Sequence, residues 1–436
     1  MKEQVGPITG DVLDFQPPIK HQSIRLEDIL KDPCAHFVKD APEVSILNDY
    51  ADKSIPKPND NVHIHDLREK KINTQFAHEI DILRKKVHNE RWPATGFMEE
   101  AVCHTRDGYF ELKTARAGEK FLFVSAGSDR IREAYDPNTR GSRIRQRALN
   151  NPVHVPGRNI VFMGIGRASN YYHWMGEQMP RLALFRKYAD LSEIDNIIVF
   201  VRNPAGFIEE SIRWLYPEFT GTVRQIDRHS VFSDEAFFFV PNSLANRTKH
   251  DTKKIIPNFR PSWGSVLDFL AYLDTRKERL ITQPDRAAST IVISRDKAPL
   301  RRWHDENDFV ASLPGARKLI SEDLSLPGQF AAFHHADTVV AQHGAGLANV
   351  LFCRPGARVI EVTARSHARR AWDFAKLGIA RGLEYHVVVI DADMDEPFVS
   401  IAEPAERIPS LYPSDLKASQ EAIAFLHELA SKPVLT

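Results

Sequence analysis

The chain has 436 residues, a length at which globular proteins usually divide into two domains. Its hydrophobic share of 42% and charged share of 27% are ordinary for a soluble protein. Lysine plus arginine number 58, and aspartate plus glutamate also number 58, so the chain has no general attraction to nucleic acid or to an anionic membrane. No apolar run reaches the roughly 18 residues that a membrane-spanning helix needs.

The polar N-terminus, MKEQVGPITGDVLDFQPP, lacks the apolar segment of a secretory signal, so we expect a cytoplasmic protein. The three cysteines are Cys34, Cys103 and Cys353. They are far apart and odd in number, which suits isolated structural thiols in a reducing compartment and provides no CxxC metal site.

The pattern along the chain divides it into four segments. Residues 1–75, rich in proline, aspartate, lysine and histidine, are expected to form an irregular leader around the first domain. Residues 76–245 and 246–410 are each expected to form a Rossmann-like domain, with a polar linker near 242–262 between them. Residues 411–436 are expected to end in a helix, for which packing back on the N-terminal domain is one option.

The predicted elements begin with a short polar helix over 76–90 and strands within 98–125, divided by a turn at Asp107-Gly108. From residue 158 onward, short continuous apolar runs alternate with helical segments, which predicts parallel sheets covered on both faces. Ligands of such sheets lie beyond the carboxyl ends of the strands, so two facing domains would place a site between those ends. The strands are expected at 159–166, 195–202, 235–241, 289–295, 315–321, 337–342, 357–363 and 385–391, and the helices at 171–189, 207–217, 263–280, 305–313, 326–336, 346–354, 367–380 and 414–430.

The segment DTVVAQHGAGLANVLFCRPGARVIEV, residues 337–362, predicts a strand, a glycine-rich turn and a helix. Small residues at such a turn let the backbone approach a ligand, and the helix start favours an anion such as phosphate. His343 could then donate to a phosphate oxygen, and Glu361 at the end of the next strand could hold a ribose. A GxG turn alone is a weak signal, because its glycines also serve any tight connection. The motif is neither a dinucleotide fingerprint nor a Walker A loop.

Arginines follow the strand STIVISR, where Arg295 stands directly at the carboxyl end. Arginine suits bidentate recognition of phosphate, so Arg295 and the nearby Arg301 are candidate phosphate ligands. For Arg301 and Arg302, a solvated pair that meets Asp305 and Glu306 remains an alternative.

The helix that contains SNYYHWMGEQMPRL, residues 169–182, places His173 and Glu177 on one face, with Arg181 one turn further. A histidine and a carboxylate at a helix start suit general-base work, which an inverting transferase needs to deprotonate its acceptor. In the alternative, His173 only orients the helix and Glu177 pairs with Arg181. The HxxxE spacing is not accompanied by a third zinc ligand at a persuasive spacing, and Pro180 is expected to make the helix irregular.

Three blocks, YYHWMGEQMPRL at 171–182, VISRDKAPLRR at 292–302 and QHGAGLANVLFCRPGARVIEV at 342–362, together with Gln329, resemble glycosyltransferase family 61. The resemblance implies a GT-B fold of two Rossmann-like domains facing across a cleft, an inverting mechanism, a nucleoside-diphosphate sugar (commonly a UDP-sugar) and no essential bound metal or cofactor. From the residues themselves we expect Glu177, preferred slightly, or His173 as the base. The expected acceptor contacts are Tyr172, Trp174 and Arg181. The expected donor contacts are His343, Gly344, Ala345, Gly346, Leu347, Asn349, Arg295, Arg301 and Glu361.

The expected function is therefore transfer of a hexosyl or pentosyl group to a glycan or lipid-linked glycan in capsule or lipopolysaccharide synthesis. The expected partners are the nucleotide-sugar donor and that acceptor, without nucleic acid and without a transmembrane segment. The sequence leaves a homodimer and a peripheral membrane contact open. Two alternatives also remain: a phosphohydrolase or epimerase of sugar nucleotides, and a non-catalytic module that binds nucleotide sugars.

Overall fold

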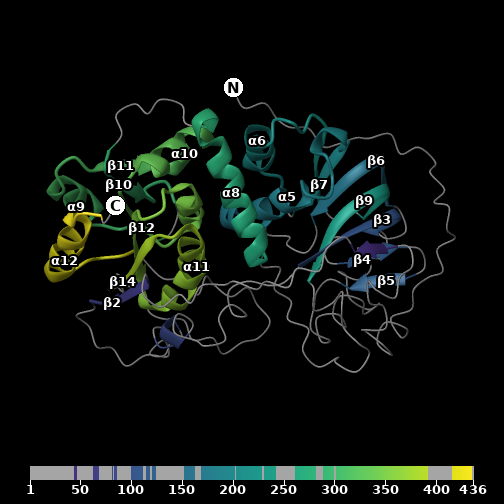
Figure 1. The fold of residues 1–436 in the computed structure, drawn as a ribbon. Coiled ribbons are helices and arrows are strands. Elements are labelled where there is room, and N and C mark those ends of the chain that lie inside the picture. Colours follow the sequence, from purple (N-terminus) through teal and green to yellow (C-terminus); the bar gives the residue numbers. More distant parts are fainter. Residues whose placement is uncertain are drawn as a thin grey trace, which may run out of the picture.

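The structure is a computed structural model. It describes residues 44–46, 62–67, 81, 83–85, 100–110, 114–117, 120–123, 152–162, 168–201, 203–227, 230–241, 261–280, 288–298, 301–390 and 415–434. Most of the predicted leader and linker, and most of the predicted helix over 76–90, lie outside these residues. Two sheets organise the described part of the chain (Figure 1).

The first sheet is mixed, with the order β5-β4-β3-β9-β6-β7-β8 and β1 paired to β3. Strands β6, β7, β8 and β9 form its parallel part, while β1, β3, β4 and β5 pair antiparallel. The prediction of a fully Rossmann-like first domain is therefore right for one half of this sheet only. Asp107 lies inside β3 with φ of 53°, so the turn expected there is absent. The strands are β1 (Val44–Ile46), β3 (Glu100–Phe110), β4 (Thr114–Ala117), β5 (Lys120–Phe123), β6 (Val153–Phe162), β7 (Asn196–Phe200), β8 (Thr222–Ile226) and β9 (Val231–Pro241).

The second sheet is parallel throughout, with the order β11-β10-β12-β13-β14-β2. This is the covered parallel sheet that the continuous apolar runs predicted. Its outermost strand β2 comes from residues assigned to the leader, which corrects that assignment: the segment joins the second sheet. The strands are β2 (Val62–Asp66), β10 (Thr290–Ser294), β11 (Arg317–Ile320), β12 (Thr338–Gln342), β13 (Arg358–Ala364) and β14 (Glu384–Ile390).

Helices α5 and α8 lie between the two sheets (Figure 1), and ring contacts continue the core from one half to the other. Trp214 on α6 meets Phe330 on α10 at 5.5 Å and Phe352 at 6.3 Å between ring centroids. The part of the chain around the first sheet and the part around the second sheet are thus packed together through one continuous apolar core. Further helices are α5 (Met179–Phe185), α6 (Gly206–Leu215), α8 (Trp263–Leu280), α9 (Glu306–Ser312), α10 (Leu326–His335), α11 (Trp372–Arg381) and α12 (Gln420–Ser431), with short helices η2 (His173–Gln178), η3 (Leu191–Glu193), η4 (Ser321–Asp323), η5 (Ala345–Phe352) and η6 (Arg365–Ala371).

The last helix, α12, packs on the second sheet beside α9, and not on the first domain (Figure 1). Arg358 of β13 holds its end, because Nη1 donates to the carbonyl oxygens of Leu429 at 3.1 Å and Lys432 at 2.6 Å. The option of packing back on the N-terminal domain is therefore wrong. In the described part of the chain, no helix combines the length and the apolar character that crossing a membrane requires.

Candidate active site

The glycine-rich turn leaves the carboxyl end of β12 and enters η5, a 3-10 helix where an α-helix was expected. Gly344 is extended, with φ of −179°, which any residue can adopt. Glycine instead provides space for Arg295, because a Cβ built on Gly344 would overlap Nη1 of that arginine. The predicted phosphate arginine therefore lies directly against the backbone of the turn.

Arg301 reaches the same turn, since its Nη1 donates to the carbonyl oxygen of His343 at 3.1 Å. Its φ of 62° is a left-handed conformation that a non-glycine residue rarely adopts, so the surrounding structure holds it there. Burial, with the charges of Arg295 and Arg370, lowers the pKa of Arg301 to about 10. A place where burial and neighbouring cations lower the pKa of an arginine favours an anion.

Leu347 was expected to contact the donor, but its amide already donates to the carbonyl oxygen of Gly344 at 3.0 Å. The amides of Gly344, Ala345 and Gly346 precede it, and the first N–H groups of a helix have no acceptor within that helix. The amides that can face a donor phosphate at this turn are therefore those of Gly344, Ala345 and Gly346.

His343 and Glu361 form one buried unit below the turn. The Nδ1 atom of His343 is hydrogen-bonded to Oε1 of Glu361, and Tyr385 donates to Oε2 of that carboxyl group at 2.7 Å. Burial raises the pKa of Glu361 and lowers the pKa of His343, so both groups favour their neutral forms. Glu361 has no exposed surface, and a ribose contact would require it to change partners.

The segment HWMGEQ forms the π-helix η2, and Pro180 stands at the start of the α-helix that follows it. A proline cannot donate to the preceding turn, and the wider turn accommodates that loss. Nδ1 of His173 lies 2.8 Å from Oε2 of Glu177, with side chains 23% and 9% exposed. Burial would raise the pKa of Glu177, but the hydrogen bond with His173 and the charges of His173, Lys376 and Arg181 lower it overall.

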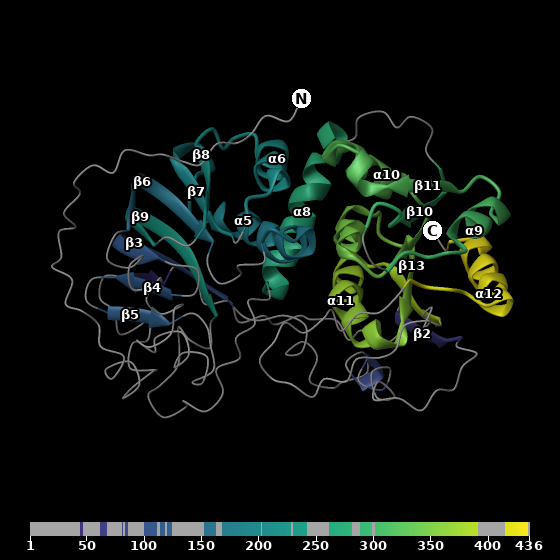
Figure 2. The same cartoon turned by 180° about the vertical axis from the view of Figure 1, so that it is seen from behind.

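The first turns of α11 contact both parts of the predicted site. The ring of Phe374 lies 4.9 Å from that of Tyr172 and 5.2 Å from that of His343. Tyr172 also donates to the carbonyl oxygen of Asp373 at 3.3 Å. Helix α11 faces α5 and α8 in both views (Figures 1 and 2). The structure thus brings the His173 pair and the glycine-rich turn to one shared helix.

Sequence reasoning assigned no functional role to η6, which follows β13, or to the first turns of α11. His367 is buried, with its ring 5.3 Å from that of His343, and Arg370, Asp373 and Lys376 all act electrostatically on the predicted residues. The signal was available: SHARRAWDFAK is basic and aromatic, and it directly follows a parallel strand, where ligand sites of such sheets lie.

The three residues expected to contact the acceptor are all buried. Trp174 has no exposed surface, and its Nε1 donates to Oγ of Ser211 at 2.7 Å. Arg181 donates to Gln178 at 2.9 Å and lies over the ring of Phe239. Trp174 in the π-helix and Arg181 in α5 thus belong to the core, and Tyr172 packs on α11.

Asn349 was expected to contact the donor but has no exposed surface. Its Oδ1 accepts from Tyr171 at 2.7 Å, and its Nδ2 donates to Oε1 of Gln329 at 2.8 Å. It therefore joins the segment just before η2 to the second half of the chain. Gln329, singled out in the sequence, is the next member of the same hydrogen-bonded chain.

A parallel sheet with two arginines and a histidine at its glycine-rich turn defines an α/β protein, and the charge at this turn favours an anionic ligand. Residues 171–360 match the family model described as Glycosyltransferase 61, which confirms the resemblance seen in the motifs. This segment is thus similar to a family of glycosyltransferases, a likeness that implies glycosyl transfer as the class of activity. No curated protein matches the chain.

Proposed function

We propose that the chain is an inverting glycosyltransferase that moves a sugar from a nucleoside-diphosphate sugar, with UDP as the first nucleotide to test. The acceptor would be a hydroxyl group of a glycan or lipid-linked glycan in surface polysaccharide synthesis. The two sheets would correspond to the acceptor and donor halves of a GT-B enzyme. One observation carries the proposal: the first turns of α11 contact both the His343 turn and the segment of His173 and Glu177.

The donor diphosphate would lie against Arg295, Arg301 and the amides of Gly344 to Gly346. With Glu361 protonated, its carboxyl group donates to Nδ1 of His343, so the hydrogen of this imidazole is on Nε2, where it can donate to a phosphate oxygen. These donors strengthen their bonds as the leaving diphosphate gains charge, which lowers the barrier. Glu361 is then a positioning residue for His343.

We assign the base to His173, which reverses the preference for Glu177 drawn from the motif. His173 is the more exposed member of the pair, and its Nδ1 already contacts Glu177. A carboxylate on Nδ1 leaves the lone pair on Nε2 to take a proton. Glu177, with its lowered pKa, stays ionised and orients the ring. The acceptor oxygen would bond to the anomeric carbon as the bond to the diphosphate breaks, and His173 would take the hydroxyl proton.

The test separates donor binding from transfer. The full chain is incubated with a panel of nucleotide sugars and glycan acceptors, while release of nucleoside diphosphate and the anomeric configuration of the product are measured. We expect His173→Ala to retain nucleotide binding and lose acceptor-dependent release, and Arg295→Ala to lose nucleotide binding.

Other outcomes would replace the proposal. Release that needs no acceptor indicates a phosphohydrolase, and isomerisation of the donor without release indicates an epimerase. Nucleotide binding without turnover, unchanged in His173→Ala, indicates a binding module. A product that keeps the anomeric configuration of the donor would refute the inverting mechanism.

A further inference from the structure

A cluster of histidines lies on one face of the second sheet, where edge strand β2 joins β14. His63 is paired in register with His386, and His65 with Val388. Side chains two residues apart on a strand share a face, so His63 and His65 line up with Glu384 and His386. The imidazoles of His63 and His386 stack with their centroids 4.6 Å apart.

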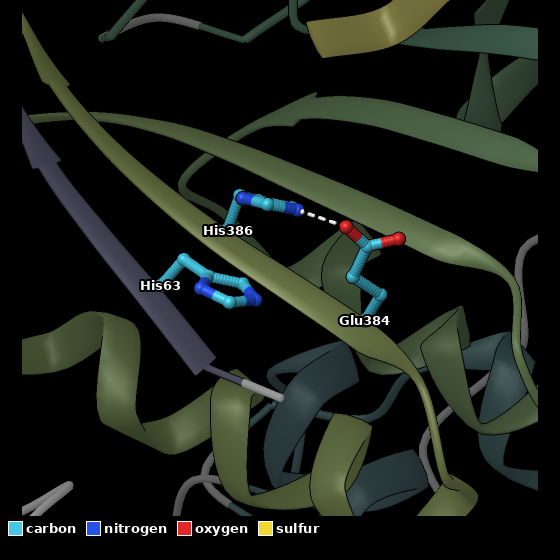
Figure 3. A group of neighbouring side chains, drawn as sticks. All are labelled: His63, Glu384 and His386. Atoms are coloured by element: carbon cyan, nitrogen blue, oxygen red, sulfur yellow. Dashed lines mark hydrogen bonds and ion pairs between the residues drawn. The ribbon is translucent and has the colours of Figure 1, made fainter. Parts of the chain in front are cut away.

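Three of these side chains present their polar atoms to one point. One ligand atom each from His63, Glu384 and His386 lies within 4.8 Å of the others. Figure 3 shows both rings with a nitrogen on the side of the carboxylate, and Nε2 of His386 lies 2.8 Å from Oε1 of Glu384. We propose that His63, Glu384 and His386 bind a divalent transition-metal ion, represented by Zn²⁺.

The donor set decides the class of ion. Two imidazole nitrogens and one carboxylate oxygen suit Zn²⁺ and its transition-metal neighbours, whereas Mg²⁺ and Ca²⁺ prefer oxygen ligands alone. Ligand atoms about 2.05 Å from a tetrahedral Zn²⁺ lie roughly 3.3 Å apart. The His386–Glu384 contact has to open slightly, and His63 has to move inward. His63 has exposed surface on an edge strand, so its ring has room to do so.

Neighbouring groups already orient two of the ligands. Nε2 of His65 lies 3.1 Å from Nδ1 of His386, which leaves Nε2 of His386 for the ion. Nε of Arg358 donates to Oε2 of Glu384 at 3.0 Å, which leaves Oε1 for the ion. Outer partners of this kind are typical of protein metal sites, where they fix the ring and the carboxylate. Water can occupy the fourth position, on the side where His63 is exposed.

The site is separate from the proposed transfer chemistry. Glu384 begins β14, so the cluster lies toward the amino ends of the strands, while the His343 turn follows the carboxyl end of β12. An ion here would join β2 to β14 across the sheet edge, in addition to their backbone ladder. Its role is therefore to stabilise the attachment of β2 to the second sheet, whatever the sugar donor is.

The experiment uses the full chain without an affinity tag, freed of metal and then equilibrated with ZnCl₂. Bound zinc after gel filtration is measured by mass spectrometry, and the unfolding temperature is measured with and without zinc. We expect one equivalent of zinc and a higher unfolding temperature. We expect both to be lost in His63→Ala and Glu384→Gln, and zinc affinity to fall about 10- to 100-fold in His65→Ala.

His104→Ala is the matched control. His104 pairs with Glu235 at 2.9 Å on the other sheet, so it tests a histidine–carboxylate contact outside the cluster, and we expect its zinc content to equal that of the wild type. The absence of stoichiometric zinc in the wild type overturns the proposal. So does zinc that persists in both His63→Ala and Glu384→Gln, or zinc that is lost only in His343→Ala, which would locate the ion at the glycine-rich turn.

Discussion

Replacing Gly344 with alanine isolates the contribution of Arg295 to ligand binding. The backbone at Gly344 is extended, so alanine adds no conformational strain there. The new methyl group would overlap Nη1 of Arg295, the flexible end of a long side chain. We therefore expect the guanidinium group to move away from the turn while the protein keeps its fold.

The size of the effect follows from what the displaced group would contribute. A hydrogen bond to a charged group is worth about 1.5–3 kcal/mol. Its loss weakens binding of a nucleoside diphosphate roughly 10- to 150-fold. The free energy of unfolding without ligand should change little, because the overlap involves no buried apolar group.

Titration calorimetry with nucleoside diphosphates measures this loss, and Gly346→Ala provides the matched control two residues away. A Cβ at Gly346 meets nothing nearer than Oγ of Ser321 at 3.5 Å, an ordinary contact. Gly346→Ala should thus bind like the wild type. Equal affinities for wild type and Gly344→Ala, or equal losses in both variants, would refute the assignment of Arg295 to the phosphate site.

Two further predictions concern buried groups. Burial raises the pKa of Glu361 from 4.5 to about 8, so over that interval the folded state holds a proton that the unfolded state releases. The free energy of unfolding that this group contributes therefore falls as pH rises, by at most about 1.4 kcal/mol per pH unit. Urea unfolding between pH 5 and 8 should show a weaker dependence of the unfolding free energy on pH in Glu361→Gln than in the wild type. Equal slopes of unfolding free energy against pH would contradict the buried neutral carboxyl group. Trp174→Phe loses the hydrogen bond to Ser211 and leaves space in the core, so it should lower the unfolding free energy by about 1–3 kcal/mol with the acceptor KM unchanged. A changed KM at unchanged stability would restore the acceptor role first expected for Trp174.

The centre of the second sheet was predictable because β12 and β13 are buried on both faces, and their short apolar runs TVVAQ and RVIEVTA carry that information locally. The first sheet was less predictable, since which strands pair antiparallel depends on contacts between distant segments. The same reason explains why the position of β2 was not predicted: nothing in its five residues, VHIHD, indicates which sheet they join. The packing of α12 likewise depends on a residue far away in the sequence, since Arg358 donates to the carbonyl oxygen of Lys432 at the end of this helix.

For the site, the amino-acid sequence by itself determined the residue types: the glycine-rich turn with His343, the arginine after β10, and the His173–Glu177 spacing. These are local patterns with a chemical meaning of their own, and the family match covers them. Only the tertiary structure decided their roles, because burial and partners depend on distant chain segments. It enclosed Trp174, Arg181 and Asn349, placed Glu361 behind His343, and joined both motifs through α11.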